Sequence, residues 1–333
     1  MRVLIVLLAG CGPSLDRVVD DAVADGFEGV IHVERGADVL LLEAWGDAIE
    51  ATDDQGAVEN TTDTVFDIGS LTKQFTAAAV LEARDRGLLD LDDTLADHFD
   101  GVPADRAGVT LHQLLTHTGG FPDALGSDDE TIDRDAYLAL AWAAERADEG
   151  SFRYSNTGYS LLAAVLERRT GQTYEAVLRE WLLLPLGMDH TGYTDPDWTG
   201  LTVATGYRRG ETAAPLSGGT YHLIGNGGLL STPADMRRWL TALDEGEVLS
   251  DTSREELWGH HVRTWPRAWY AYGWGVEDWL LMGWNVNHDG SNGFFYAHVV
   301  WWPEQETYVA LFTNHWQPVH DGLAWRLSRA VLR

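Results

Sequence analysis

Apolar residues gather in short runs near both ends of the chain, and these runs predict β-strands. Near the start, Val30 to Val33 and Val39 to Trp45 are rich in β-branched and large apolar side chains, with turn residues between them. In the last third, Tyr272 to Trp279, Phe294 to Trp302 and Thr307 to Thr313 are aromatic and β-branched runs separated by turn residues. The pattern therefore predicts a hairpin early in the chain and a group of strands at its end.

Helical spacing of apolar residues dominates the stretch between these two groups of strands. The alanine-rich segment from Leu71 to Arg86 predicts a helix that Gly87 ends. Thr110 and Gln113 have the spacing of a capping box, and Thr232 followed by a proline is typical of a helix start. Further helices are predicted at Leu15 to Val23, Leu161 to Arg168, Tyr174 to Leu183 and His320 to Leu332.

The order of these elements predicts an α+β fold, because strands lie at both ends and helices in the middle. We expect an antiparallel sheet built from N- and C-terminal strands, flanked by helices and carrying an inserted, mainly helical lobe. One domain would span 14–333, with an α/β lobe at 14–75 plus 225–333 and a helical lobe at 76–224. An active cleft would lie between the two lobes.

Composition restricts the partners of the protein more than its fold. The 333 residues are 45% hydrophobic, which is enough for a large core, and the formal net charge is −29. Such a surface repels phosphate groups, so we expect no nucleic acid and no anionic membrane surface as partners. Solubility is the simplest account of this charge, and a cationic partner is the alternative. No stretch is long and apolar enough to cross a bilayer as a helix.

The first residues of the chain have the pattern of a secretory leader. Arg2 and an apolar run at 3–8 precede Cys11, the only cysteine, so no intramolecular disulfide is possible. Together with Ala9 and Gly10, this pattern resembles a bacterial lipoprotein signal. The resemblance implies a signal peptide at 1–10, secretion across the inner membrane, and a periplasmic or cell-surface protein anchored through lipid on Cys11. The apolar run is shorter than the usual 7–15 residues, so a truncated ordinary signal, a misassigned start or a buried first strand remain alternatives.

Lys73 is the only lysine among the 23 basic residues, and it follows Ser70 by three positions. A brief predicted strand, Val65 to Ile68, precedes Ser70, and a predicted helix follows it, so the two side chains share a helical face. A neutral lysine can take the proton of a serine hydroxyl if its surroundings lower its pKa, whereas an arginine cannot. Amide groups at the helix start could also stabilise an oxyanion. The spacing therefore suggests a nucleophile and its base; a capping serine beside a solvated lysine is the alternative.

The second candidate group is Tyr154-Ser155-Asn156, on a predicted loop just before a helix. Near a lysine ammonium, a tyrosine can be held as phenolate or share its proton. The amide of Asn156 could donate to a substrate carbonyl and accept a hydrogen bond from Lys73. Taken alone, this stretch is better explained as a turn with an asparagine cap and a core tyrosine.

The third group is His288-Asp289-Gly290-Ser291, which we expect to enter the strand at Phe294 to Trp302. A backbone N–H group here could be a second oxyanion donor, and Gly290 would let a substrate approach closely. His288 could relay a proton or hold a substrate anion. A glycine-rich hairpin with an ordinary histidine is the alternative.

Other residues give weaker signals. Five tryptophans precede His288, and they either line an acyl pocket or, more simply, pack within strands: Trp265, Trp269, Trp274, Trp279 and Trp284. His117 could contact the cleft, although an architectural role is the simpler expectation. The pair His260-His261 has no carboxylate or cysteine at ligand spacing, and no phosphate-binding glycine loop is evident, so we expect no metal and no cofactor.

The ordered motifs Ser-x-x-Lys, Tyr-x-Asn and His-x-Gly resemble the serine β-lactamase and penicillin-recognising family, most closely its class C branch. That branch also contains carboxylesterases and D-amino-acid peptidases. Four further stretches agree with the family pattern, and the resemblance covers nearly the whole chain after the leader: 114–120, 154–166, 185–188 and 227–233. The resemblance implies a β-lactamase/transpeptidase-like fold and acyl transfer to a serine.

The same resemblance implies a role for each residue that matches a family motif. Ser70 would form the acyl-enzyme, and Lys73 and Tyr154 would share the general-base function, first for Ser70 and then for the hydrolytic water. Asn156 would orient Lys73 and the substrate. The N–H groups of Ser70 and Ser291 would form the oxyanion hole.

One departure from the family pattern bears on the substrate. β-Lactamases of this branch usually have a lysine where this chain has His288, and histidine is mostly neutral at pH 7. Loss of that fixed cation should weaken the binding of an anionic β-lactam by about 1–2 kcal/mol. We therefore expect a small neutral or cationic ester, amide or peptide as substrate. A D-amino-acid or cell-wall peptidase, a weak β-lactamase, and a penicillin-binding sensor or scaffold without turnover are the alternatives.

Overall fold

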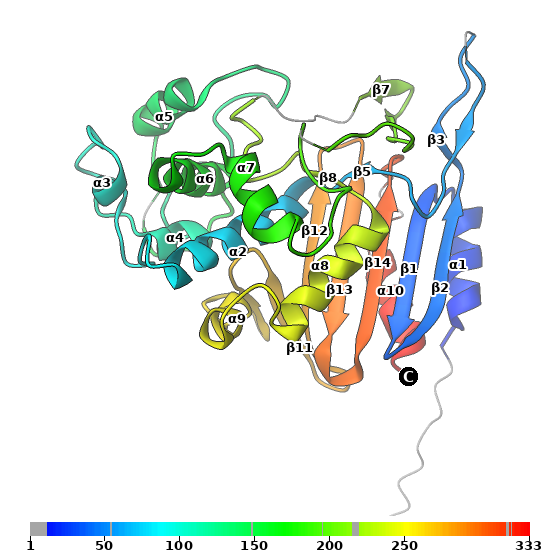
Figure 1. Ribbon diagram of the computed structural model, residues 1–333. Helices are drawn as coiled ribbons and strands as arrows, with labels where there is room; N and C mark the ends of the chain where they lie inside the picture. Colours follow the sequence, from blue (N-terminus) through cyan, green and yellow to red (C-terminus); the bar gives the residue numbers. More distant parts are fainter. Residues whose placement is uncertain are drawn as a thin grey trace, which may run out of the picture.

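The computed structural model describes residues 12–53, 55–147, 149–194, 196–214, 220–317, 320 and 322–333. At its centre is an eight-stranded sheet with the order β2-β1-β14-β13-β12-β11-β10-β9, in which all neighbours are antiparallel (Figure 1). β1 (Gly29–Arg35) pairs with β2 (Asp38–Trp45) on one side and with β14 (Thr307–Thr313) on the other. The predicted α+β fold, with a sheet built from both ends of the chain, is confirmed.

Helices cover both faces of this sheet. α1 (Leu15–Ala24) and α10 (Leu323–Val331) pack on one face, and α2 (Thr72–Asp85) and α8 (Pro233–Glu245) pack on the other (Figure 1). Along β14, alternate side chains point into these two cores, which explains why the whole strand is buried and why Tyr308 to Phe312 are apolar or aromatic.

The remaining strands of the sheet follow one another in the last third of the chain: β9 (Val262–Trp265), β10 (Ala268–Tyr270), β11 (Gly275–Trp279), β12 (Gly283–Ser291) and β13 (Tyr296–Trp302). The hydrophobic pattern did not predict β9, β10 or β12. In β12 the polar side chains of Asn285 and Asn287 bond to each other at 2.9 Å, so polar residues occupy strand positions. The expectation that His288 to Ser291 enter β13 is therefore wrong, because they form the end of β12.

Most of the other helices lie together beside one end of the sheet (Figure 1). They are α3 (Leu95–His98), α4 (Leu111–Leu115), α5 (Arg134–Ala143), α6 (Asn156–Thr170) and α7 (Tyr174–Leu178), which η2 (Arg179–Leu183) continues, while α9 (Asp251–Leu257) follows α8. The predicted caps at Thr110 and Thr232 are both present. Short turns and strand pairs complete the described elements: η1 (Gly69–Leu71), η3 (Pro303–Gln305), β3 (Asp47–Ile49) with β4 (Val58–Glu59), β5 (Phe66–Asp67) with β8 (Leu230–Ser231), and β6 (Gly206–Arg208) with β7 (Glu211–Ala213).

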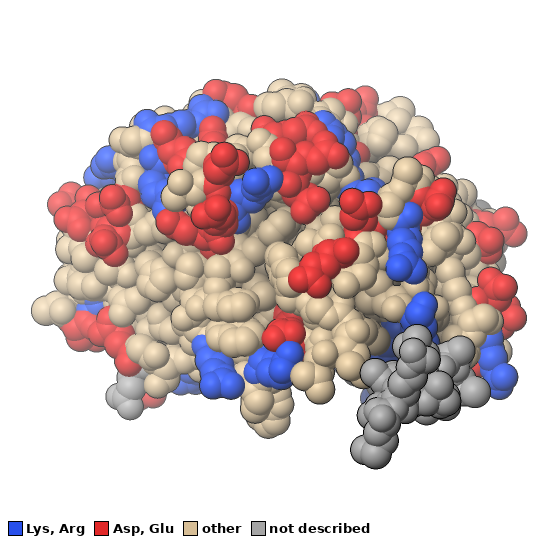
Figure 2. All heavy atoms as spheres, turned by 90° about the horizontal axis from the view of Figure 1, so that it is seen from below, with Lys and Arg blue, Asp and Glu red and all other residues tan. Residues whose placement is uncertain are grey.

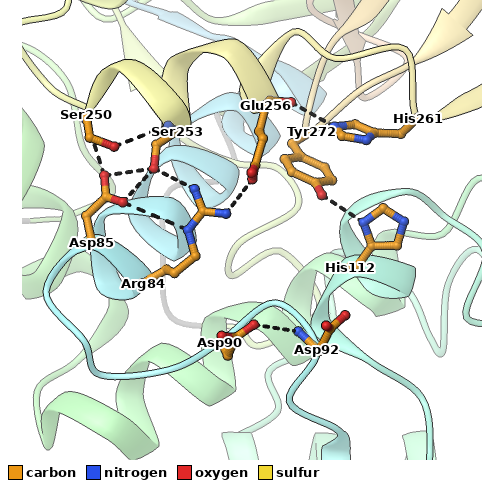
Figure 3. A network of polar contacts seen from close by, with 10 residues as sticks. All are labelled: Arg84, Asp85, Asp90, Asp92, His112, Ser250, Ser253, Glu256, His261 and Tyr272. Carbon is orange, nitrogen blue, oxygen red and sulfur yellow. Dashed lines mark hydrogen bonds and ion pairs between the residues drawn. The ribbon is translucent and has the colours of Figure 1, made fainter.

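A polar network fixes the far end of α2, the helix that carries Lys73 (Figure 3). Arg84, near the end of α2, donates to Glu256 and to Ser253 Oγ of α9, the latter at 2.7 Å. Close by, Nδ1 of His112 on α4 lies 2.7 Å from the hydroxyl of Tyr272. The bonds of Arg84 connect α2 to α9, and the bond of His112 connects α4 to the segment between β10 and β11, so the far end of the helix that carries the candidate base is fixed.

The N-terminal predictions fall partly outside the described structure. Cys11 and the predicted signal peptide at 1–10 lie outside the described residues. Within the described part of the chain, no helix has both the length and the apolar character needed to span a bilayer.

Candidate active site

Ser70 lies in η1 and Lys73 in the first turn of α2, and their functional atoms meet. Nζ of Lys73 lies 3.0 Å from Oγ of Ser70, 2.6 Å from Oδ1 of Asn156 and 2.7 Å from the carbonyl oxygen of Asn226. The Lys73 side chain has no exposed surface. A solvated lysine, the alternative considered above, is therefore not what the structure contains.

Burial makes Lys73 suited to act as a base. Desolvation lowers the pKa of Lys73 from 10.5 to about 7, and the carboxylates of Asp123, Asp128 and Asp289 act in the opposite direction. A large fraction of the amine is therefore neutral near pH 7.

The two amide oxygens around Lys73 also fix the direction of its lone pair. Oδ1 of Asn156 and the Asn226 carbonyl can only accept hydrogen bonds, so two N–H groups of the amine must point to them. The neutral amine then has its lone pair left for the hydroxyl of Ser70, the third neighbour. Asn156 is held by Asp123, whose Oδ1 accepts from Nδ2 of Asn156 at 3.1 Å.

Tyr154 immediately precedes Ser155, the N-cap of α6, and its phenol reaches Ser70. The Ser70 hydroxyl lies close enough to the phenol to favour its ionised form, and the ring centroid lies 4.8 Å from Nζ of Lys73. Burial raises the pKa of Tyr154 above its usual value of 10. The phenolate considered from the sequence is therefore disfavoured in this environment, and a neutral phenol that can pass on a proton is favoured.

The ring of His117 packs against the ring of Tyr154. The His117 ring packs 4.4 Å from the ring of Tyr154, and Nδ1 of His117 accepts the backbone N–H of Ser155 at 3.1 Å. The side chain is buried, and the backbone of His117 has a φ of 58°. His117 is thus part of the architecture that positions Tyr154, in agreement with the simpler expectation.

Two glycines let the end of β12 pack against η1. A Cβ atom on Gly290 would lie 2.1 Å from the carbonyl oxygen of Ile68 and 2.7 Å from the backbone nitrogen of Ser70. Gly69 has a φ of 51°, and a Cβ atom there would lie 2.8 Å from the backbone nitrogen of Ser291. The close approach brings the segments of the two proposed oxyanion donors, Ser70 and Ser291, together.

His288 is buried and neutral. Nδ1 lies 2.6 Å from the carbonyl oxygen of Asp289, an acceptor, so Nδ1 carries the proton. Nε2 is then left to accept from the hydroxyl of Tyr270 at 3.2 Å. Burial lowers the pKa of His288 to about 4. This position therefore holds no cation at neutral pH.

Ser70, Tyr154 and His288 face a common pocket of about 370 Å³. Its lining consists of Ser70, Tyr154, Tyr270, Gly275, Asn287, His288, Asp289 and Ser291. None of the five tryptophans before His288 is part of this lining; Trp274 is fully buried, and Trp265 is 75% exposed. Trp269, Trp279 and Trp284 lie in β10, β11 and β12, as the simpler interpretation expects, whereas Trp274 is buried just before β11 and Trp265 faces outward at the end of β9.

The mouth of the pocket is acidic. Asp289 lines the pocket and is exposed, and Asp123 is exposed next to Asn156. The sequence did not indicate Asp123, Tyr270 or Asn226, because no motif contains them and Asn226 acts through its backbone. Among the described residues, no group of three histidine, cysteine or acidic side chains is placed to hold a metal ion.

Known proteins are similar to this chain over most of its length. The family model described as "Beta-lactamase" matches residues 15–333. Penicillin-binding protein 4 of Amycolatopsis lactamdurans is 32% identical, over 76% of this chain and 73% of its own length. Penicillin-binding protein 4* of Bacillus subtilis is 26% identical, over 87% of this chain, and the chain spans 66% of that relative. The crystal structure of a penicillin binding protein from Bacillus halodurans superimposes with a TM-score of 0.80 at 25% identity, covering 96% of this chain and 98% of that one.

Proposed function

Since the chain belongs to the beta-lactamase family, we propose that it is a serine hydrolase that forms an acyl-enzyme on Ser70 and cleaves a small ester or amide. One observation carries the proposal. The buried amine of Lys73 lies between two oxygens that can only accept, which leaves its lone pair for the hydroxyl of Ser70.

Acylation would proceed by transfer of the Ser70 proton to Nζ of Lys73 while Oγ attacks the substrate carbonyl. The N–H groups of Ser70 and Ser291 would stabilise the oxyanion of the tetrahedral intermediate. When the intermediate collapses, the bond to the leaving alcohol or amine breaks, and that group takes a proton from the Lys73 ammonium through the Tyr154 hydroxyl.

Deacylation would use the same groups. A water molecule gives a proton to neutral Lys73 as its oxygen attacks the acyl carbonyl, and the ester bond to Oγ of Ser70 then breaks. The proton returns from Lys73 to Ser70, and the carboxylic acid leaves. No cofactor enters these steps.

The charges around the pocket support a neutral or cationic substrate. His288 is uncharged, and the carboxylates of Asp123 and Asp289 flank the mouth. A substrate carboxylate would meet this negative potential without a fixed cation to offset it. A D-amino-acid peptidase is the second candidate, because the free ammonium of a short peptide suits the same carboxylates.

The test is hydrolysis of short-chain p-nitrophenyl esters by the purified protein. Ser70→Ala should reduce kcat by a factor on the order of 10⁴ or more. Nitrocefin, an anionic β-lactam, should be a poor substrate, and fast nitrocefin hydrolysis would overturn the argument from His288. A burst of one product equivalent without steady turnover would instead indicate a sensor.

We also propose that the protein is secreted and anchored through lipid on Cys11. The support is the sequence pattern at 1–11 alone. Metabolic labelling with palmitate should mark the wild-type chain and should be lost in Cys11→Ser; labelling that survives this substitution would remove the proposal.

A further inference from the structure

Exposed apolar side chains gather at one end of the sheet. In the described part of the chain, nine large apolar side chains are exposed, and five of them occupy the turn ends of β-hairpins. They are Val39 (58% exposed), Leu40 (44%), Trp265 (75%), Leu280 (79%) and Leu281 (94%). Leu280 and Leu281 lie within the run Trp279-Leu280-Leu281-Met282 of the β11–β12 turn.

The pairing of the strands places these turns at the same end. The β9–β10 turn touches the end of β11, because the Asp278 N–H donates to the Arg267 carbonyl at 2.9 Å and the two side chains form an ion pair at 2.7 Å. At the other edge, the N–H of Gly36 in the β1–β2 turn donates to the Glu306 carbonyl at 2.8 Å, beside the β13–β14 connection. We call this surface the turn end of the sheet: residues 36–40, 265–267, 279–282 and 303–306.

The turn end lies opposite the candidate active site. β12 starts there at Gly283 and ends at Ser291 beside Ser70, so the length of a strand separates the two. Both ends of the described chain also lie at this end, below the sheet in Figure 1. Gly12 lies against the guanidinium of Arg333, and the guanidinium of Arg329, one turn earlier in α10, lies 4.9 Å from the ring centroid of Trp279.

The turn end carries charges of both signs, with Arg267 and the three carboxylates of Asp38, Glu304 and Glu306. Figure 2 views the molecule from below: a broad uncharged band covers the left and centre of this face, and both acidic and basic side chains occur on its right half, on the side of the sheet. Arg267, Arg329 and Arg333 lie at this end, and the carboxylates beside them include Asp278, which Arg267 pairs, and Glu304, which lies against Gly283. Arginines bind phosphate groups well, and exposed leucine and tryptophan favour the boundary between headgroups and acyl chains.

We propose that the turn end docks on a phospholipid bilayer, with Leu280 and Leu281 inserted into the interface. Insertion removes their apolar surface from water, and the arginines can contact lipid phosphates. The net charge of −29 disfavours strongly anionic membranes, so apolar insertion supplies the attraction. Cys11 directly precedes Gly12 at this end, so a lipid there would hold the turn end against the bilayer and the pocket away from it.

A site-specific probe tests this docking in the full chain. Cys11→Ser removes the only cysteine, after which Leu281→Cys or, as the matched control, Leu184→Cys carries an environment-sensitive fluorophore. Leu184 is 49% exposed and follows η2, away from the sheet turns. With phosphatidylcholine vesicles, the probe at 281 should shift to the blue and be quenched by nitroxide lipids, and the probe at 184 should do neither. If the protein co-sediments with vesicles but the fluorescence of the probe at 281 does not change, the proposal is overturned. Residues 1–11 alone would then bind the membrane.

A second test compares the vesicle binding of chains in which exposed leucines are substituted. In the Cys11→Ser chain, Leu280→Asn with Leu281→Asn should lower vesicle partitioning by about tenfold, whereas Leu140→Asn with Leu184→Asn, which removes two other exposed leucines, should not. Circular dichroism and ester hydrolysis report whether both variants fold. A chain that is dimeric in sedimentation velocity, and whose dimer the Leu280/Leu281 variant dissociates, would show that a second copy covers the turn end and would overturn the membrane assignment.

Discussion

Nζ of Lys73 lies 2.6 Å from Oδ1 of Asn156, and this contact directs the proton-accepting side of the amine towards Ser70. The contact is between a buried amine and a neutral amide, so it orients the lysine without stabilising its positive charge as a carboxylate would. The pKa of about 7 depends on that neutrality.

The rate of ester hydrolysis should follow the deprotonation of Lys73. Above the pKa of about 7 the amine is neutral and can act as base, so kcat/KM should rise with pH through 7 and level off above about pH 8. A profile measured with a neutral ester, free of substrate titration, checks this. A flat profile between pH 5.5 and 8.5 would mean that another group is the base.

Replacing Asn156 by aspartate should move that profile. A carboxylate next to Nζ favours the ammonium form, so Asn156→Asp should shift the midpoint of kcat/KM upward by about 1–3 pH units. Asn156→Ala is the matched control, because it removes the hydrogen bond without adding charge and should lower kcat without an upward shift. If both variants keep the wild-type midpoint, Lys73 does not set it.

Burial of Lys73 should cost stability at low pH. In the unfolded chain the lysine stays protonated up to about 10.5, whereas the folded chain loses the proton above about 7. Between these values the unfolded state binds more protons, so the free energy of unfolding gains a contribution that rises with pH. Lys73→Met lacks this contribution. Its stability advantage over the wild type, measured by urea unfolding, should therefore be largest near pH 6–7 and shrink by ~3 kcal/mol towards pH 9. An advantage that is independent of pH would contradict a depressed lysine.

Gly290→Ala should damage both folding and activity. The added methyl group would lie 2.1 Å from the Ile68 carbonyl oxygen, so η1 and β12 must move apart and the amides of Ser70 and Ser291 with them. We expect a loss of about 1–3 kcal/mol in stability and at least about 10²-fold in kcat. Gly108→Ala is the control, because nothing lies within 4 Å of a Cβ atom there. Wild-type kcat in Gly290→Ala would contradict the proposed oxyanion site.

Charge preference should depend on Asp289. We compare kcat/KM for a quaternary-ammonium ester with that for its uncharged isostere, and the ratio should fall several-fold in Asp289→Asn. The effect should be larger at low ionic strength, because the carboxylate is exposed and screened by salt. Asp16→Asn removes the same charge from α1, far from the pocket, and should leave the ratio as it is. An equal effect of both substitutions would mean that only the overall charge matters.

The sequence predicted those parts of the fold and site that depend on local pattern. Apolar runs at both ends predicted the sheet, and the three-residue spacing of Ser70 and Lys73 predicted that they meet. β12 was missed because Asn285, Asn287 and Asp289 interrupt its apolar pattern, although Asn285 and Asn287 bond to each other and Asp289 pairs with His298 of β13.

Other site features could not be predicted, because they depend on contacts between distant segments. The carbonyl of Asn226 is a backbone group and has no signature in the sequence. Asp123 reaches Asn156 from a loop 33 residues earlier in the chain. The protonation states of Tyr154 and His288 follow from how completely the fold removes them from water, which the types of residue alone do not reveal.

The pairing of β1 with β14 has a consequence for how the protein is made. Residues 30–35 find their partners only at 307–312, so β1 cannot pair with β14 until synthesis has passed residue 312. Until then β13 lacks its second neighbour, and the sheet that holds β12 against η1 is unfinished. A nascent chain should therefore have no catalytic activity. A ribosome-stalled or truncated product that ends before residue 307 should not bind substrate and should be degraded by proteases.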